Sequence, residues 1–103
     1  MPDRPSQDWE VRPRFAAEID VVDLRRLEEA ARSVGAPSAV AMLEEGTLAR
    51  SLRMTVVVTG ITAGAAVDSA IDLVRSAGVA AGLELGVFRD AEVMPAGQDP
   101  RMT

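Results

Sequence analysis

The sequence predicts an α+β domain in which two helices cover one face of a four-stranded antiparallel sheet. Residues 9–19 and 47–59 alternate apolar and polar side chains, which is typical of strands with one buried face. Residues 20–36 and 63–77 repeat apolar side chains every three or four positions, which indicates two amphipathic helices. Two short apolar segments supply the remaining strands, at 38–44 and 83–89. With right-handed crossovers, this order favours the split βαβ plan.

The first strand and first helix have the clearest patterns. Between Trp9 and Ile19 the apolar residues take the odd positions, and Pro13 among them predicts an edge position, a bulge or a late start to pairing. In the helix, Asp20 is a candidate N-cap and Gly35 suits the left-handed residue after its end. Its apolar stripe consists of Leu24, Leu27, Ala31 and Val34.

The second half of the chain predicts a hairpin, a helix and a last strand. Glu45 and Gly46 form the expected tight turn between strands 38–44 and 47–59. The second helix is expected from Ala63 to about Ala77, with Gly78 and Gly82 as alternative ends and Ala81 as an extension. The predicted boundaries are a flexible arm at 1–8, the domain at 9–95 and a flexible tail at 96–103.

Composition excludes several classes of function. The chain of 103 residues fits one domain, and its formal charge of −5 argues against nucleic-acid binding. It contains no Cys and no His, so neither a thiolate nucleophile nor the usual metal ligands are present, and no metal or cofactor is expected. No apolar run approaches the roughly 20 residues of a membrane span, and a soluble cytoplasmic protein is expected.

The segment MTVVVTGITAGAAVDSAIDLV, residues 54–74, resembles a nucleotide-binding turn in outline only. A P-loop needs Lys after its last glycine, and a dinucleotide turn needs a third glycine. The preferred interpretation is structural: Gly60 lets the chain turn, Thr62 caps the helix and Gly64 permits close packing. The alternative is a weak anion site at Gly60, Thr62 and Gly64, where free helix amides attract negative charge.

Three arginines are expected on the sheet face that the helices leave open. Arg12, Arg14 and Arg53 form either a cationic patch for an acidic partner or a solvated face of cross-strand ion pairs. RNA recognition is rejected because no aromatic residue accompanies them, unless Phe88 points outward. Trp9 either plugs one end of the core or anchors a partner.

No catalytic residue is expected. Paired carboxylates occur at Glu28/Glu29, Glu44/Glu45 and Asp68/Asp72, but a catalytic pair needs one buried member, and these lie among charged neighbours. A small carboxylate-based enzyme therefore remains only as an alternative.

Two resemblances add to this interpretation. The order of elements resembles the ferredoxin-like superfamily, including the ACT ligand-sensing domains, which bind an amino acid at a glycine-containing turn between strand 1 and helix 1. Here that junction, residues 18–23, has no glycine. The chain is also similar to small actinobacterial and phage domains that can precede a helix-turn-helix. That likeness lies in FAAEIDVVDLRRL, EEGTLARSLRMTVVVTG, AAVDSAIDLVRSAG and AEVMPAG.

The expected function is that of a non-enzymatic regulatory or protein-interaction module. It would act through its sheet, as a homodimer, and could recognise a further protein partner. The interface candidates are Trp9, Arg12, Arg14, Arg53 and Phe88. The alternative is an ACT-like sensor domain with an anionic ligand near the Gly60–Gly64 turn.

Overall fold

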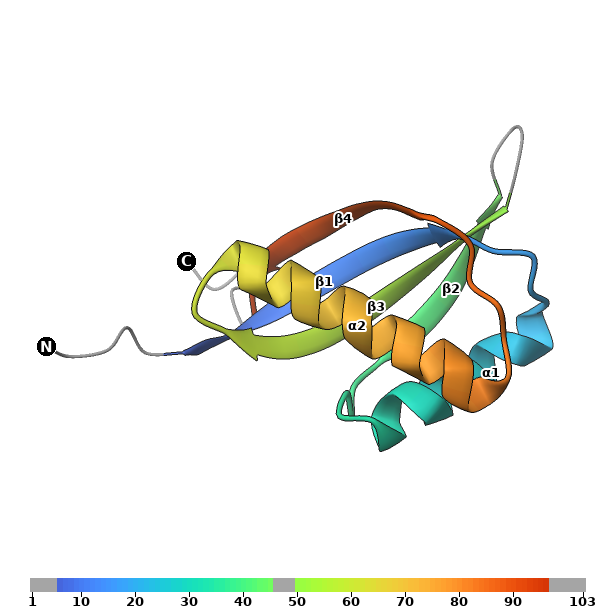
Figure 1. Ribbon diagram of the computed structural model, residues 1–103, viewed down its shortest axis with the longest axis horizontal. Coiled ribbons are helices and arrows are strands. Elements are labelled where there is room, and N and C mark those ends of the chain that lie inside the picture. The colour runs from blue at the N-terminus through green and yellow to red at the C-terminus, as the bar shows by residue number, and fades with distance from the viewer. Residues whose placement is uncertain (1–5, 46–49, 97–103) are drawn as a thin grey trace, which may run out of the picture.

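The computed structural model describes residues 6–45 and 50–96 and confirms the predicted ferredoxin-like α+β fold. Every neighbouring pair of strands is antiparallel, in the order β2-β3-β1-β4. Figure 1 shows α2 lying across the sheet. The elements are β1 (Gln7–Ala16), α1 (Val21–Ser33), β2 (Val40–Glu45), β3 (Arg50–Gly60), α2 (Ala63–Ala81) and β4 (Phe88–Pro95).

Both helices pack on the same face of the sheet. Alternate residues of β1 and β3 are buried there, together with one stripe of each helix, as the two periodicities predict. Val34 of the predicted first stripe is the exception, because it lies just beyond the end of α1 and is exposed. Phe15 is the only aromatic residue in the fully buried part of this core. Its ring meets Phe88 edge to face with centroids 5.7 Å apart, and the Arg75 guanidinium lies 5.1 Å from the Phe15 centroid. The other core residues include Val11, Leu27, Leu52, Met54, Val56, Ala70 and Val74.

The fourth strand is not where the sequence pattern suggested. Residues 83–87 are a connection, and β4 begins at Phe88 and runs to Pro95. Leu83 and Leu85 do pack against the core, which explains the apolar signal, but they do so from outside the sheet. As an edge strand β4 exposes alternate residues, so its own sequence carries a weak apolar pattern.

Pro13 lies in a central strand, so the predictions of an edge position and of a late start are wrong. The β1–β3 pairing passes from Val11↔Val56 to Arg14↔Arg53 without an intervening pair. Because proline has no N–H to donate, the ladder tolerates it only with such an interruption. The irregularity predicted as a bulge occurs on the other side of β1, where the β4 register shifts between Arg14 and Phe15.

The helix ends follow the predicted chemistry, with one change. Asp20 is the N-cap of α1, and its amide donates to the Asp23 carboxylate at 3.0 Å. Gly35 has a φ of 125°, beyond the end of α1. The second helix continues through Ala81 and ends at Gly82, which has a left-handed φ of 72°, rather than at Gly78.

Some predicted boundaries shift and others fall outside the described residues. The first strand ends at Ala16 rather than at residue 19, although Ala17 and Ile19 remain buried beyond it. Gly46, residues 47–49 of the third predicted strand, and most of the predicted arm and tail are not described. In the described part of the chain, neither helix is long and apolar enough to cross a bilayer.

Candidate interaction surface on the open face of the sheet

The sheet face turned away from the helices, called the open face below, is rich in charge. Strand register places Arg14 between Arg53 of β3 and Asp90 of β4, and places Arg12 opposite Glu92. The three predicted arginines therefore do lie together on one surface, because side chains alternate between faces along each strand. Their acidic neighbours come from the other strands and from β1 itself: Glu10 of β1, Glu44 of β2, and Asp90 and Glu92 of β4.

A continuous chain of ion pairs crosses the open face and touches all four strands. Arg12 contacts Glu10 at 2.7 Å and Glu92 at 3.7 Å. Glu92 also contacts Arg53 at 3.3 Å, and Arg53 reaches Glu44 of β2 at 2.8 Å. Cross-strand pairs of opposite charge stabilise a sheet, and here one of them, between Glu92 and Arg53, reaches across β1 from β4 to β3.

Arg14 makes a separate, two-pronged contact with Asp90. Its Nε donates to Asp90 Oδ1 at 3.1 Å, and its Nη2 donates to Asp90 Oδ2. Parallel hydrogen bonds of this kind fix the planes of both groups and join β1 to the edge strand β4.

Arg53 is the centre of this surface, with a side chain that is 20% exposed. Burial alone would lower its pKa, but the hydrogen bonds and charges of Glu44 and Glu92 outweigh burial and raise the pKa above its ordinary value. A raised arginine pKa contributes stability that is fully present below the ordinary arginine pKa and is lost as the pH rises from that value through the raised pKa. Arg53 therefore stays charged wherever the protein is folded in practice.

The open face is a set of paired charges rather than a cationic patch. The contacts above join three guanidinium groups to four carboxylates, so cross-strand pairing matches the arginine charge. Apolar side chains flank the charges on the two outer strands. On β2, Met42 is 50% exposed and Val40 is similarly open, and on β4 Met94 is 36% exposed.

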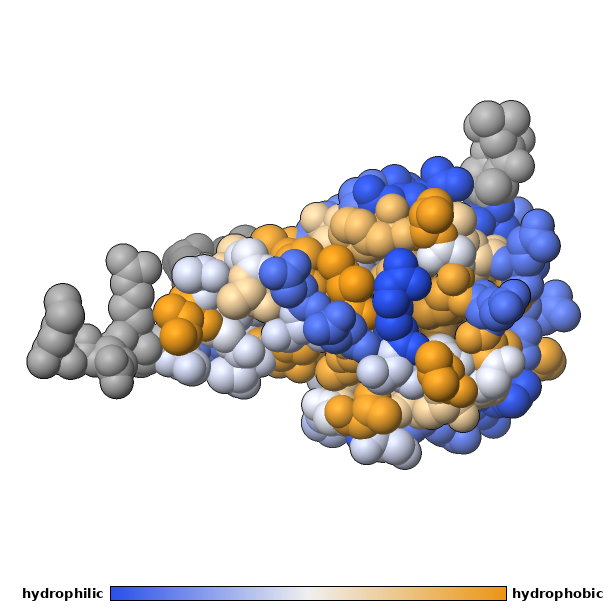
Figure 2. All heavy atoms as spheres, in the orientation of Figure 1, coloured by the Kyte–Doolittle hydropathy of each residue, from blue (hydrophilic) through white to orange (hydrophobic). Residues whose placement is uncertain are grey.

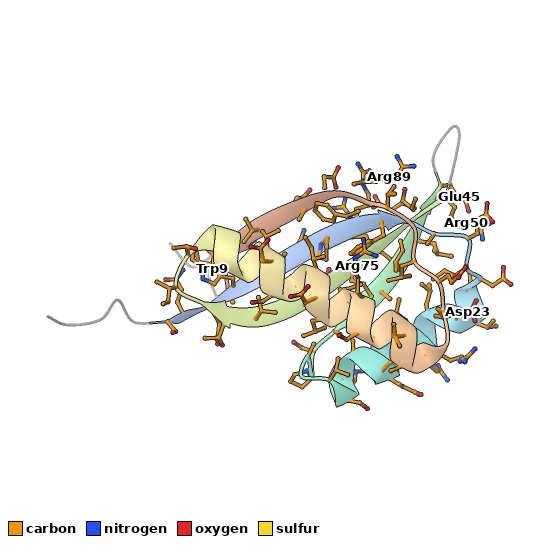
Figure 3. All side chains as sticks on the ribbon, in the orientation of Figure 1. Trp9, Asp23, Glu45, Arg50, Arg75 and Arg89 are labelled. Carbon is orange, nitrogen blue, oxygen red and sulfur yellow. The ribbon has the colours of Figure 1, made fainter. Side chains whose placement is uncertain are left out.

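Trp9 and Phe88 do not join the arginines, because both lie on the helix face. Trp9 packs against the core, and its indole Nε1 donates to the Gly60 carbonyl at 3.0 Å. Figure 3 shows Trp9 near the start of α2, where it closes that end of the core. Phe88 is half-buried against Phe15, so it does not point outward to stack a base. Roles for Trp9 and Phe88 in binding a partner stay predictions.

The Gly60–Gly64 turn is built as a helix start. Thr62 Oγ1 accepts from the Ala65 amide at 3.1 Å, as the predicted cap. A side chain at Gly60 would come within 3.3 Å of the Ala66 amide, so the chain turns tightly there. The prediction that Gly64 permits close packing is wrong, because Gly64 is exposed and a Cβ there would meet nothing within 4 Å.

A hollow of about 760 Å³ lies at the opposite end of the sheet, between the β1–α1 junction and residues 82–86. Glu18, Asp23 and Glu84 line it beside Ile19 and Leu85. The sequence pattern did not reveal this hollow, because residues 83–86 were expected inside a strand rather than in the connection that forms one wall.

Three of the six paired carboxylates considered as catalytic candidates are engaged elsewhere. Glu28 accepts from the backbone amide of Ala41 at 2.9 Å, Glu44 binds Arg53, and Glu45 binds Arg50 at 2.9 Å. Asp68 and Asp72 lie exposed on α2. Within residues 6–45 and 50–96, no group of three or more His, Cys, Asp or Glu residues is placed to hold a metal ion.

The surface on the side of the molecule that carries α2 is a mixture of apolar and polar side chains. Figure 2 shows apolar side chains dispersed among hydrophilic ones there. The most exposed large apolar residue of α2 is Val79, at 81%. Scattered exposed apolar residues are normal on a protein surface, so the ordered contacts of the sheet are the stronger candidate for an interface.

Comparisons with known proteins supply no family for this chain. No protein-family model matches the sequence, and no curated protein matches it either. Inference about function therefore rests on the geometry described above.

Proposed function

We propose that this protein is a non-enzymatic interaction module that acts through its sheet, as a homodimer, in a regulatory role. The observation that carries the proposal is the arrangement of the layers: both helices cover one face, and the other face and the outer edge of β4 remain available. Sheets with open faces and edges commonly associate with another chain, and closed two-fold dimers are the commonest oligomers.

Two features of the open face support this role. The ion-pair chain from Glu10 to Glu44 holds the charged side chains in place, so less conformational entropy is lost when a partner covers them. The flanking side chains of Met42 and Met94 supply adaptable apolar contacts at both borders. A partially neutralised surface with apolar borders suits a protein partner better than it suits a polyanion.

Sedimentation equilibrium across a wide concentration range tests the dimer. We expect the apparent mass to rise from 10.9 kDa, the mass of one chain, toward twice that value. An apparent mass that stays at one chain from micromolar to near-millimolar concentration would refute the homodimer.

A small-molecule sensor is the second candidate, and the hollow at the β1–α1 junction is the observation that favours it. ACT-like domains place their ligand at this junction, whereas the Gly60–Gly64 turn is the alternative position for an anion. A thermal-shift screen with amino acids, amines, nucleotides and phosphate separates the two positions. Stabilisation by a cationic ligand that Glu18→Gln weakens supports the hollow, whereas stabilisation by phosphate that Thr62→Ala weakens supports the turn.

We further propose that the chain belongs with the small actinobacterial and phage domains that it resembles, and that it acts in the cytoplasm on a regulatory or phage-host partner. Its Lys-free composition, in which every cationic side chain is Arg, agrees with a high-GC origin. Affinity capture from such a host, followed by mass spectrometry, would identify the partner.

A further inference from the structure

We propose that two copies of this chain pair along the outer edge of β4, antiparallel and centred on Val93, to form one continuous sheet. The inference rests on the proposed homodimer and specifies which surface makes it. Three observations lead to it: the opposite edge is covered, the β4 edge presents unpaired backbone groups, and one symmetric register places no carboxylate against another.

The β2 edge is covered by the molecule itself. Ala41 lies on β2, and its backbone amide donates to the Glu28 carboxylate of α1 at 2.9 Å instead of pointing to open solvent. A strand that approached this edge would have to displace Glu28 and leave its carboxylate without that hydrogen bond. Covering an edge with a helix side chain is one way in which proteins prevent pairing there.

The β4 edge has no such cover among the described residues. The Ala96 amide donates to the Asp8 carbonyl at 2.9 Å, so the even-numbered residues of β4 turn their backbone groups toward β1. Ala91, Val93 and Pro95 therefore turn theirs outward. β4 is the last strand of the sheet, and no hydrogen bond within residues 6–45 and 50–96 reaches the amides of Ala91 and Val93.

Symmetry restricts how two β4 strands can pair. When the two-fold axis passes beside Val93, each Val93 amide donates to the Val93 carbonyl of the second copy. Each Ala91 amide then donates to the carbonyl of the second copy's Pro95. Pro95, which has no N–H, only has to accept in this arrangement. The pairing makes four backbone hydrogen bonds and places Val93 against Val93 on the helix face.

Charge on the open face selects this register from its neighbours. Centred on Val93, the strands place Glu92 opposite Met94 of the second copy. A shift to Glu92 as centre sets Glu92 against Glu92, and a shift to Ala91 sets Glu92 against Asp90. Like charges directly opposite one another on a sheet are destabilising. Centring on Met94 avoids that clash but leaves only two backbone hydrogen bonds between the described β4 residues, because Pro95 then opposes Val93.

Single cysteines test the pairing directly, because the chain has no cysteine of its own. Hydrogen-bonded residues on antiparallel strands have Cα atoms about 5.5 Å apart, within the range that a disulfide spans. We expect Val93→Cys to form a covalent dimer under mild oxidation at micromolar concentration. Met42→Cys, on the covered edge and more exposed than Val93, is the control and should still cross-link at least tenfold more slowly.

Charge variants at Met94 test the register without a cross-link. Met94→Arg places a cation opposite Glu92 of the second copy, and Met94→Asp places an anion there. Two such pairs form in each dimer, so we expect the dimer dissociation constant to fall about tenfold for Met94→Arg and to rise about tenfold for Met94→Asp. Met42→Arg and Met42→Asp should leave it unchanged.

The outcomes separate this inference from the proposed function. A wild-type chain that remains monomeric at every concentration refutes both. Two outcomes would overturn β4 pairing while leaving the homodimer in place. In the first, the wild-type chain dimerises but Val93→Cys cross-links no faster than Met42→Cys. In the second, the dimer affinity does not change with the charge at Met94. Should Val93→Cys fail to fold, the Met94 variants decide alone, because Met94 is on the surface.

Discussion

Among the glycines that the structure describes, Gly86 is the one where an added methyl group should damage the fold most. Here the chain leaves the α2–β4 connection and joins the end of β1. The Gly86 amide donates to the Ala16 carbonyl at 2.7 Å, and the Ala16 amide donates to the Val87 carbonyl at 2.9 Å. A Cβ at position 86 would lie 2.5 Å from Ala16 O, closer than the 3.0 Å that real Cβ atoms respect. Gly86→Ala must therefore push the two segments apart.

The size of the effect follows from what the displacement breaks. Two backbone hydrogen bonds weaken, each worth about 0.5–1.5 kcal/mol. Overpacking against backbone, which yields less than a flexible side chain, adds strain of about 1–3 kcal/mol. We expect Gly86→Ala to lower the free energy of unfolding by about 2–4 kcal/mol. With a urea m-value of roughly 1.5 kcal/mol/M, the denaturation midpoint should fall by about 2 M.

Urea denaturation followed by far-UV circular dichroism measures this change, and Gly64→Ala is the matched control. Gly64 lies exposed in the first turn of α2, and an added Cβ meets nothing within 4 Å. Replacing it restricts the unfolded chain and should raise stability by about 0.5 kcal/mol. If the two alanine variants shift the midpoint in the same direction, or if Gly86→Ala leaves it unchanged, the close approach to Ala16 is wrong.

Three further changes test other contacts, each by urea denaturation. Arg53→Met should lower the free energy of unfolding by about 1–2 kcal/mol, a modest loss because its acidic partners are half exposed. In 1 M NaCl the difference from wild type should shrink, and a loss that does not depend on salt would contradict the ion-pair account. Thr62→Ala removes the cap on the Ala65 amide and should lower the free energy of unfolding by about 1 kcal/mol, whereas Thr62→Ser should retain most of that stability. Trp9→Phe loses the hydrogen bond to Gly60 and should cost about 1 kcal/mol by circular dichroism; an unchanged midpoint would show that the indole contact contributes nothing.

Periodicity within single segments was enough to predict the elements and the faces of the central strands. Val11 and Phe15 of β1, and Leu52 and Met54 of β3, are buried as their alternation indicates. The same alternation places Arg12, Arg14 and Arg53 on the opposite surface. These are local properties, because the direction of a side chain relative to its own strand depends only on its position along that strand.

The edge strand β4 was misplaced by the sequence analysis because its pattern depends on its neighbours, whereas the other edge strand, β2, was predicted close to its observed position. The apolar run at 83–87 supports the core from a connection, and residues 88–95 form a strand because β1 supplies their backbone partners. Gly86 also shows its constraint only when Ala16 is beside it. Neither the position of β4 nor the constraint at Gly86 can be read from a periodicity within residues 83–95.

Pairing across the sheet was decided only by tertiary structure. The sequence alone predicts that three arginines share one surface. It does not predict that Glu92 of β4 lies between Arg12 and Arg53, or that Glu28 of α1 accepts from the Ala41 amide of β2. Those contacts join residues from 13 to 80 positions apart, and they depend on the order of strands. Local sequence determined which residues face the core and which face water, because that choice needs one strand or helix. Which edge is covered and which is exposed depends on the whole fold, because a strand lies at an edge only in relation to the order of all the other strands.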